Sequence, residues 1–277
     1  MPVFIASLNS GSNGNCYYVG NEQEAILVDI GISCREVEKR MQRLGLDMQR
    51  VQAIFISHEH NDHISGLAVT ANKYNLPVYM TNQTFRKCGI KLREETVVSF
   101  NAVHPVSIGQ LSVKAFPKSH DACDPHSFLV SSVSGVSVGI FTDIGQPCTE
   151  LIYHFKKCHA AFLESNYEEE MLMNGKYPYY LKNRIRGGLG HLSNAQALEL
   201  FTGHRPAFMT HLFLAHLSKD NNCPKLVEEM FNLHASGTQI IIASRYKETP
   251  VFEIKPACSG FSYKVLTAQV PTQMSLF

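Results

Sequence analysis

The chain has 277 residues, of which 44% are hydrophobic and 18% are charged, and its formal net charge at pH 7 is +1. This composition is ample for a buried core, and the near-neutral charge excludes nucleic-acid binding through the overall field of the molecule. No segment approaches the roughly 20 apolar residues of a membrane span, and residues 1–6 lack the basic region of an export signal. Eight scattered cysteines without a C-x-x-C pair fit reduced thiols, so we expect a cytoplasmic protein.

The elements alternate in a way that predicts two sheets. The first predicted element is a strand at residues 3–9, and a turn follows it at residues 10–15. Further strands are predicted at residues 16–19, 24–30, 53–57, 77–81, 160–164, 207–217 and 239–243, with several between residues 96 and 142. Helices are predicted after Ser33, near residue 64, and at residues 150–157, 194–201 and 224–234. A strand-rich first part and a mixed second part predict an α/β (α+β) fold, with one domain over residues 1–266.

Four potential metal ligands lie within the six residues from 58 to 63, His-Glu-His-Asn-Asp-His. They follow an apolar strand and precede the predicted helix start at residue 64, so we expect them in a strand-to-helix loop. His58 and His60 are two residues apart and point the same way in an extended segment, whereas Asp62 and His63 are adjacent and diverge. One pair is therefore suited to hold one ion and the other pair a second ion.

This H-x-H-x-D-H pattern resembles the signature of the metallo-β-lactamase superfamily. The resemblance implies an αββα sandwich, with two mixed β-sheets flanked by helices and a metal centre at one sheet edge. It implies two divalent ions, zinc or manganese, with iron as a further candidate. It also implies a role for Asp29, which ends a predicted strand and would brace the histidine loop without binding metal.

The remaining metal ligands are implied by the same resemblance. His120 matches the third histidine of the first metal, and Asp143 matches the carboxylate that bridges both metals. His216, in an H-x-S context, matches the last ligand of the second metal. His211 competes for that role, although it is five residues away and would face the other side of the strand.

Glu164 and His191 are candidates for proton transfer. In nuclease members of the superfamily a glutamate–histidine pair at these places is associated with proton delivery, so Glu164 would orient the imidazole of His191. Asp62 and Asp143 complete the predicted catalytic set. The alternative interpretation is a histidine at a helix entry beside a buried carboxylate.

A basic segment lies between these two residues in the sequence. Lys182, Arg184 and Arg186 stand next to a run of tyrosines, and cations contact phosphates while aromatic faces stack on bases. These three residues are therefore predicted to bind nucleic acid, either DNA or RNA. A solvated basic helix face is the alternative.

Several motifs in order resemble the YycJ/WalJ-type metallo-hydrolases, bacterial cytoplasmic proteins linked with DNA exonuclease activity. The motifs are S-G-S-N-G-N-C, S-H-E-H-x-D-H, E-S-N-Y, Y-P-x-x-L-K-x-R-I, G-H-L-S-N and A-H-L-S-K-D-N-N. The resemblance implies a dinuclear metal-dependent phosphodiesterase that acts as a 5′-to-3′ DNA exonuclease in repair or replication. A hydrolase of small esters, lactones or thioesters is one alternative, and a non-catalytic nucleic-acid or clamp adaptor is another.

The end of the sequence predicts a flexible tail over residues 267–277, because it lacks periodicity and contains a proline. Its last five residues, Gln-Met-Ser-Leu-Phe, resemble the pentapeptide Q-L-S/D-L-F with which bacterial replication and repair proteins bind the sliding clamp. The resemblance implies that Leu276 and Phe277 fill an apolar pocket of the clamp and that Gln273 hydrogen-bonds beside it. A frayed tail is the alternative.

Overall fold

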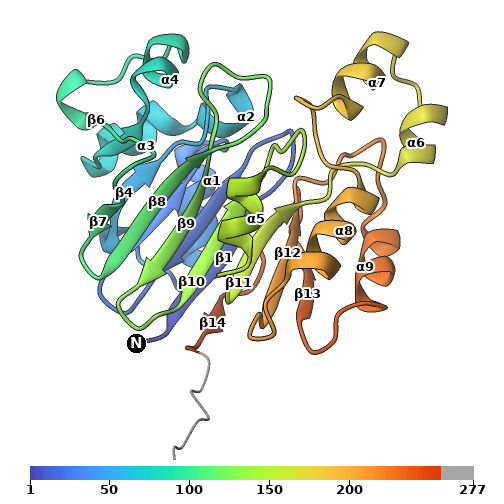
Figure 1. Ribbon diagram of the computed structural model, residues 1–277. Coiled ribbons are helices and arrows are strands. Elements are labelled where there is room, and N and C mark those ends of the chain that lie inside the picture. Colours follow the sequence, from blue (N-terminus) through green and yellow to red (C-terminus); the bar gives the residue numbers. More distant parts are fainter. Residues whose placement is uncertain (257–277) are drawn as a thin grey trace, which may run out of the picture.

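Two mixed β-sheets lie face to face between layers of helices (Figure 1). The structure, a computed structural model, describes residues 1–256. The first sheet has seven strands in the order β14-β1-β2-β3-β4-β5-β6, and the second has seven in the order β13-β12-β11-β10-β9-β8-β7. This architecture confirms the αββα sandwich that the resemblance to the metallo-β-lactamase superfamily implies.

The strands of the first sheet are β1 (Val3–Asn9), β2 (Cys16–Gly20), β3 (Ala25–Val28), β4 (Val51–Phe55), β5 (Val78–Met80), β6 (Val97–Ser99) and β14 (Phe252–Ile254). The strands of the second sheet are β7 (Val106–Ile108), β8 (Leu111–Pro117), β9 (His126–Ser132), β10 (Ser137–Phe141), β11 (Ala160–Glu164), β12 (His211–Ala215) and β13 (Gln239–Ile242). The helices are α1 (Cys34–Arg43), α2 (Asn61–Ile64), α3 (Leu67–Tyr74), α4 (Asn82–Lys87), α5 (Thr149–Phe155), α6 (Glu169–Asn174), α7 (Tyr179–Arg186), α8 (Asn194–His204) and α9 (Pro224–Asn232), with 3-10 turns η1 (Met48–Arg50) and η2 (Glu94–Thr96).

Each sheet has a parallel half. Strands β3 to β6 run parallel in the first sheet, and strands β10 to β13 run parallel in the second. Parallel neighbours end at the same edge, so the loops that follow them gather there. These loops carry most of the predicted metal ligands, and they meet between α2 and α7 in the upper part of Figure 1.

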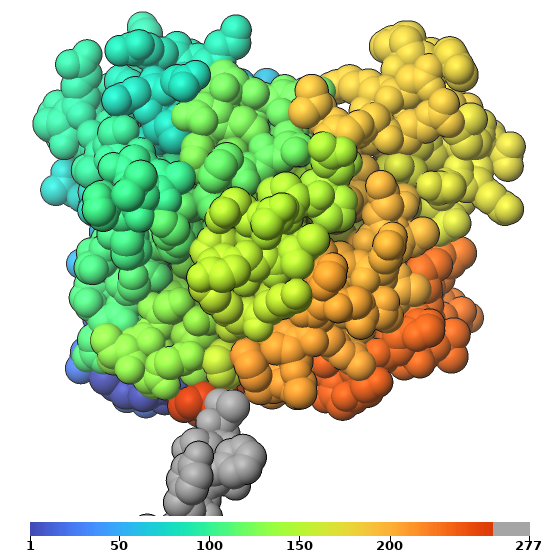
Figure 2. All heavy atoms as spheres, in the orientation of Figure 1, coloured from blue at the N-terminus to red at the C-terminus, as the bar shows by residue number. Residues whose placement is uncertain are grey.

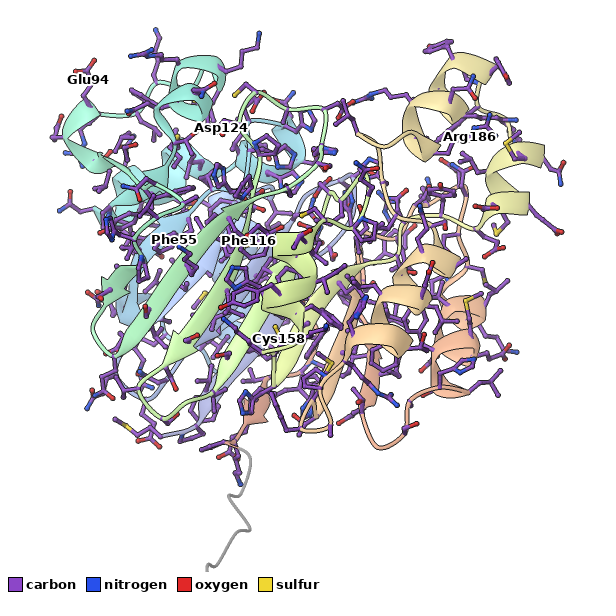
Figure 3. The ribbon with its side chains drawn as sticks, in the orientation of Figure 1. Phe55, Glu94, Phe116, Asp124, Cys158 and Arg186 are labelled. Carbon is purple, nitrogen blue, oxygen red and sulfur yellow. The ribbon has the colours of Figure 1, made fainter. Side chains whose placement is uncertain are left out.

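The core is built in three layers. Between the sheets, Phe55 of β4, labelled in Figure 3, stacks on Tyr79 with ring centroids 4.7 Å apart and meets Phe128 of β9 edge-on at 5.8 Å. On the outer faces, α1 and α3 cover the first sheet, and α5, α8 and α9 cover the second. Because central strands are buried on both faces, they appear in the sequence as apolar runs such as residues 160–163.

Local signals explain where several elements begin. The Ser33 hydroxyl accepts a hydrogen bond from the Glu36 N–H and starts α1, as predicted. Ser193 and Gln196 form a reciprocal capping box at the start of α8. Pro224 occupies the first turn of α9, where its missing N–H has no cost.

Several predicted boundaries differ from the structure by a few residues, and two of them bear on the site. A helix near residue 64 was expected to follow the histidine loop, but α2 begins at Asn61, so Asp62 and His63 lie on a helical turn. The strand predicted at residues 207–217 covers only His211–Ala215. The predicted tail at residues 267–277, with Gln273, Leu276 and Phe277, lies outside the described residues. Among residues 1–256, no helix has the length and apolar character that a membrane crossing requires.

Candidate metal centre

The structure gathers the predicted ligands into three neighbouring groups, the last two of which share Asp143 and His216, and in each group the ligand atoms lie within 4.8 Å of one another. These groups are His58, His60 and His120; Asp62, His63, Asp143 and His216; and Asp143, Glu164, His191 and His216. They contain all seven predicted metal ligands and both predicted proton-transfer residues. Residues from the first sheet and from the second sheet therefore meet in one site.

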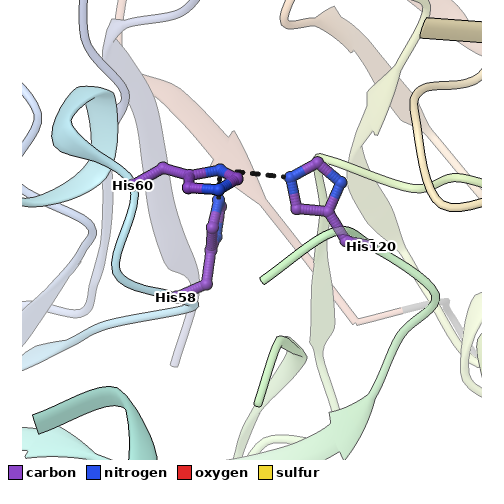
Figure 4. Close-up of side chains that lie close together, drawn as sticks. All are labelled: His58, His60 and His120. Carbon is purple, nitrogen blue, oxygen red and sulfur yellow. Dashed lines mark hydrogen bonds between the residues drawn. The ribbon is translucent and has the colours of Figure 1, made fainter. Parts of the chain in front are cut away.

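The first group joins His58 and His60, which follow β4, to His120, which follows β8 of the other sheet (Figure 4). His58 Nε2 lies 3.0 Å and His120 Nε2 lies 3.3 Å from His60 Nδ1. The other ring nitrogens of His58 and His120 lie 2.9 Å from Ser57 Oγ and 3.0 Å from the Gly190 carbonyl oxygen. Burial lowers the pKa of His58 well below its ordinary value and that of His120 to about 4. Both rings are therefore neutral near pH 7, which is the form that binds a metal.

The second group lies beside the first. It contains Asp62 and His63 from α2, Asp143 from the loop after β10, and His216, which directly follows β12. His63 Nε2 lies 3.1 Å from Asp143 Oδ2 and 3.5 Å from Asp62 Oδ2. His216 Nε2 lies 3.4 Å from the same Asp62 oxygen. Two imidazoles and two carboxylates are a donor set suited to a divalent metal.

His211 lies apart from these groups. It is the first residue of β12, and its ring packs against Phe252 with 5.4 Å between the ring centroids. His216 follows the last residue of the same strand and has a left-handed backbone angle, φ 56°. The geometry therefore favours His216 over His211 as the ligand.

Asp143 belongs to two groups, and its two oxygens face different neighbours. Oδ2 lies 3.1 Å from His63 Nε2, whereas Oδ1 lies 3.9 Å from His120 Nε2 and 3.4 Å from His216 Nδ1. Burial opposes the charge on this carboxyl, but His216 and His63 hold its pKa well below the ordinary value. The carboxylate is ionised and lies between the first group and the second.

Two buried carboxylates support the histidines from behind. Asp29 Oδ2 lies 2.7 Å from His63 Nδ1, and Glu164 Oε1 lies 2.8 Å from both His216 Nδ1 and His191 Nδ1. Such contacts fix the orientation of an imidazole and direct its opposite nitrogen toward a metal. Burial opposes the charge on Glu164, but His191 and His216 lower the pKa of its carboxyl to about 2, so it is ionised when it accepts these bonds.

The residues present fit a metal centre. Asp143 Oδ2 and His216 Nε2 are buried, and neither has a hydrogen-bond partner among residues 1–256. Buried polar atoms without partners are costly, and a divalent cation in the second group would satisfy both atoms. Burial lowers the pKa of His216, but the surrounding carboxylates of Asp143, Asp62 and Glu164 outweigh this effect and raise that pKa to about 10, so the second group favours a positively charged occupant. A bound cation would supply that charge in place of the proton.

The turn at residues 10–15 also supports the site, a role that the sequence analysis missed. Asn15 Nδ2 donates to Asp62 Oδ2 at 3.2 Å, and the Asn15 N–H donates to the Asp62 carbonyl oxygen at 2.7 Å. Gly31 packs against that carbonyl so closely that a Cβ would clash with it. The His216 N–H donates to Ser10 Oγ at 2.8 Å. The S-G-S-N-G-N-C motif carried a usable signal, because polar residues between two apolar strands need partners.

The predicted metal ligands open into a cleft of about 370 Å³. Figure 2 shows the hollow at the top of the molecule, with α6 and α7 in yellow on one side of it. The floor of the cleft contains His60, Asp62, His120, Asp143, His191 and His216, and its α7 side contains Tyr177, Leu181, Arg184 and Ile185. The ligands are thus accessible to a substrate while most of them remain buried.

Of the three predicted nucleic-acid-binding residues, one lies in the cleft. Arg184 lines it, and Arg184 Nε donates to Asp121 Oδ2 at 2.5 Å. Lys182 Nζ donates to the Met173 carbonyl oxygen at 2.7 Å, and Arg186, labelled in Figure 3, lies with Nη1 3.7 Å from Met173 Sδ. Lys182 and Arg186 therefore turn toward α6, and the three cations form no continuous row along the cleft.

Comparisons with known proteins agree with this geometry. Residues 10–94 match a family model described as the metallo-beta-lactamase superfamily. The chain is 34% identical to exodeoxyribonuclease YycJ of Bacillus anthracis over 231 residues, which cover 82% of this chain and 86% of YycJ. It is 31% identical to exodeoxyribonuclease WalJ of Streptococcus pneumoniae over 229 residues, which cover 79% of this chain and 83% of WalJ. The metallo-beta-lactamase fold protein YhfI from Bacillus subtilis has a TM-score of 0.67 at 16% identity, over 91% of this chain and 100% of YhfI.

The fold and the clustered ligands define a metal-dependent hydrolase of the metallo-β-lactamase class. Within that superfamily, the chain belongs to the family of the YycJ and WalJ exodeoxyribonucleases. This result confirms the resemblance inferred from the order of the motifs.

Proposed function

We propose that the chain is a dinuclear metal-dependent phosphodiesterase that removes nucleotides from DNA in the 5′-to-3′ direction. The observation that carries this proposal is Asp143, whose two oxygens lie between a three-histidine group and a second ligand group. A carboxylate placed between two ligand sets suits two ions about 3.5–4 Å apart, the spacing of two-metal hydrolases. The names of the YycJ and WalJ relatives add the DNA substrate and the exonuclease reaction.

The donor atoms narrow the choice of metal. The first group offers three imidazole nitrogens, which suit zinc, and the second adds carboxylates, which widen the choice to manganese. Zinc and manganese are therefore the ions to test first, with iron third. When bound, such ions lower the pKa of a water and stabilise negative charge on phosphate oxygens.

Glu164 and His191 are proposed to provide the proton that the leaving oxygen needs. Glu164 Oε1 accepts a hydrogen bond from His191 Nδ1 at 2.8 Å. The other ring nitrogen, His191 Nε2, is therefore available for proton transfer in the cleft. Glu164 Oε2 accepts the N–H groups of Ile144 and Leu192 at 2.7 and 3.1 Å, so the carboxylate is fixed on both oxygens. Glu164 is therefore proposed to position His191 rather than to contact the substrate.

Residues of α7 are proposed to guide the substrate. Arg184 lies in the cleft, where its guanidinium would contact a phosphate next to the cleaved bond. Lys182 and Arg186 lie on the α6 side of the helix and are proposed to contact phosphates farther along the strand.

The test is cleavage of end-labelled DNA and RNA, single-stranded and duplex, with zinc or manganese. The matched control is Asp143→Asn, because asparagine tolerates the left-handed backbone of this position, φ 55°. We expect the wild type to release 5′ nucleotides from DNA and the variant to lose on the order of 10³-fold in kcat, since a metal supplies several kcal/mol of transition-state stabilisation.

Other outcomes would replace the proposal. Efficient hydrolysis of a neutral ester or thioester, without cleavage of DNA, would identify the small-molecule hydrolase. Protein that retains no metal after gentle purification, yet binds DNA, would identify the adaptor.

We also propose that Gln273, Leu276 and Phe277, outside the described residues, recruit the enzyme to the sliding clamp. A short peptide would bind weakly alone and gain from tethering when the enzyme also holds DNA. Deletion of residues 273–277 should leave cleavage of short oligonucleotides unchanged and remove co-elution with the clamp. Equal clamp binding by the truncated and full-length chains would refute this role.

A further inference from the structure

A second pocket borders the metal cleft. It has a volume of about 340 Å³, within the range of small-molecule sites, and lies where β12 and β13 end and α9 begins (Figure 1). We call it the lateral pocket. Leu217, Pro224 and Ile242 give it apolar walls, and Lys219, Arg245, Tyr246 and Lys247 give it a polar rim.

The rim is positively charged. Lys219, Arg245 and Lys247 line the lateral pocket, and its lining residues within 1–256 include no carboxylate. None of the three cations has an ion-pair partner among the described residues, in contrast to Arg184 in the cleft. An apolar pocket with three unpaired cations at its rim matches a ligand that has a flat apolar part and negative charges, which is the chemistry of a nucleotide.

Tyr246 supplies an aromatic surface at the same rim. Its side chain is 71% exposed, whereas its backbone is held, since its N–H donates to Ser244 Oγ at 3.1 Å and its carbonyl accepts from Arg40 Nη2 at 3.4 Å. A fixed backbone with an exposed ring forms a stacking platform that loses little freedom on binding.

The lateral pocket adjoins the metal cleft. Ser218 lines both, and Ser10, which lines the lateral pocket, accepts the backbone N–H of His216 at 2.8 Å. Lys219 is three residues beyond His216, so their Cα atoms are at most about 11 Å apart. A strand with one phosphate at the metal ligands would therefore place a neighbouring nucleotide at the lateral pocket.

One turn holds both sites in place. The Ser10 N–H donates to the Ser244 carbonyl oxygen at 3.1 Å, and Asn13 Nδ2 donates to the Arg245 carbonyl oxygen at 2.9 Å. The same turn holds Asp62 through Asn15. The S-G-S-N-G-N-C motif thus links the metal ligands to the loop at residues 244–247, which gives the two sites a fixed separation.

We propose that the lateral pocket binds a nucleotide of the single-stranded substrate next to the cleaved bond, an inference that rests on the proposed nuclease activity. The base stacks on Tyr246 and enters the apolar pocket, and Lys219, Arg245 and Lys247 contact the flanking phosphates. The pocket therefore extends substrate recognition beyond the metal centre.

The experiment compares an oligodeoxynucleotide with bis(p-nitrophenyl) phosphate, a diester too small to reach from the metal ligands to the lateral pocket. The variants are Tyr246→Ala and the double variant Lys219→Ala with Lys247→Ala. Controls are Tyr153→Ala and Lys156→Ala, exposed residues on or next to α5 that line neither site. Tyr246→Phe keeps the ring and tests stacking directly.

We expect Tyr246→Ala to lower kcat/KM for the oligonucleotide relative to the small diester by about 5- to 150-fold, the range for loss of one stacked base. Tyr246→Phe and both controls should keep the wild-type ratio. The double lysine variant should lower the slope of log affinity against log salt by about 1.4, because each phosphate contact on a single strand contributes about 0.7.

Two results would overturn the inference: a wild-type ratio in Tyr246→Ala and in the lysine variant, or an equal loss on both substrates. A wild type that hydrolyses the small diester but no DNA would refute the proposed nuclease activity itself, and the lateral pocket would lose its assignment with it.

Discussion

Three residues of the site have left-handed backbone angles, although none is glycine. Asp29, Asp143 and His216 have φ of 59°, 55° and 56°, and each lies just past the carboxyl end of a strand. This conformation costs on the order of 1 kcal/mol or more for a non-glycine residue. The hydrogen bonds of Asp29 to Ser57 and of the His216 N–H to Ser10 compensate for it. Such strain at three strand ends is typical of a functional site.

Glu164 contacts both His191 and His216 at 2.8 Å. It is therefore proposed to support two functions, proton transfer by His191 and metal binding by His216. We predict that His191→Ala retains the metal content of the wild type and loses about 10²- to 10⁴-fold in kcat, the usual contribution of acid–base help. Glu164→Gln should lose metal as well as turnover, because His216 would lose its charged partner. Metal analysis together with single-turnover rates distinguishes the two variants. Loss of metal in His191→Ala would instead make His191 a ligand.

At the scale of elements, the sequence predicted the long and strongly patterned ones well. The predicted bounds of β1 and β11 agree with the structure, and α1 begins after Ser33 as expected. The four-residue helix α2 was placed too late because a single turn has no helical period of its own. Its start depends on distant contacts, such as the Asn15 N–H to the Asp62 carbonyl and the Ile30 N–H to the His63 carbonyl.

The candidate site, like the fold, was predictable from the sequence only where its residues are close together in the chain. The spacing of His58, His60, Asp62 and His63 is local, so the residues alone indicated a metal site. The later ligands were assigned by family resemblance, in which the H-x-S context favoured His216 over His211. The support from Ser10 spans 206 positions, and such long-range pairings leave no local pattern in a single sequence.

The contact between α1 and α3 gives a prediction about stability and pH. Glu38 of α1 accepts from Tyr74 at 2.7 Å and pairs with Lys73 at 2.6 Å, and these two partners lower the pKa of Glu38 from 4.5 to about 2. Because the folded pKa lies below the unfolded one, this stabilisation is present above about pH 4.5 and is lost as the pH falls toward 2.

Glu38→Gln should therefore lower the free energy of unfolding by about 1 kcal/mol or less at neutral pH, the usual value of a partly exposed ion pair. Urea unfolding of chelated wild type and variant measures this, and the difference should shrink at about pH 3. Glu199→Gln, on the exposed side of α8, serves as the control. A difference that stays constant between the two pH values would show that charge on Glu38 does not contribute.

At the scale of the whole molecule, the candidate metal centre lies where the two sheets meet. His58, His60, Asp62 and His63 come from the first sheet and its following helix, whereas His120, Asp143 and His216 follow strands of the second. Away from the predicted metal ligands, the two sheets are held together mainly by the apolar layer around Phe55 and Phe128. A metal bound by ligands from both sheets would add a cross-link at the open edge of that layer.

We therefore predict that metal removal destabilises the fold as well as ending catalysis. A ligand that binds only the folded state adds roughly 3–4 kcal/mol at 100 to 1,000 times its Kd, so chelation should lower Tm on the order of 5–15 °C for a chain of this size. Differential scanning calorimetry of wild type with and without a chelator measures the shift. Asp143→Asn, which has lost the carboxylate between the two ligand groups, should show a smaller shift. An identical Tm for the chelated and metal-loaded wild type would mean that the ligands do not cross-link the sheets, and that the apolar layer alone holds them together.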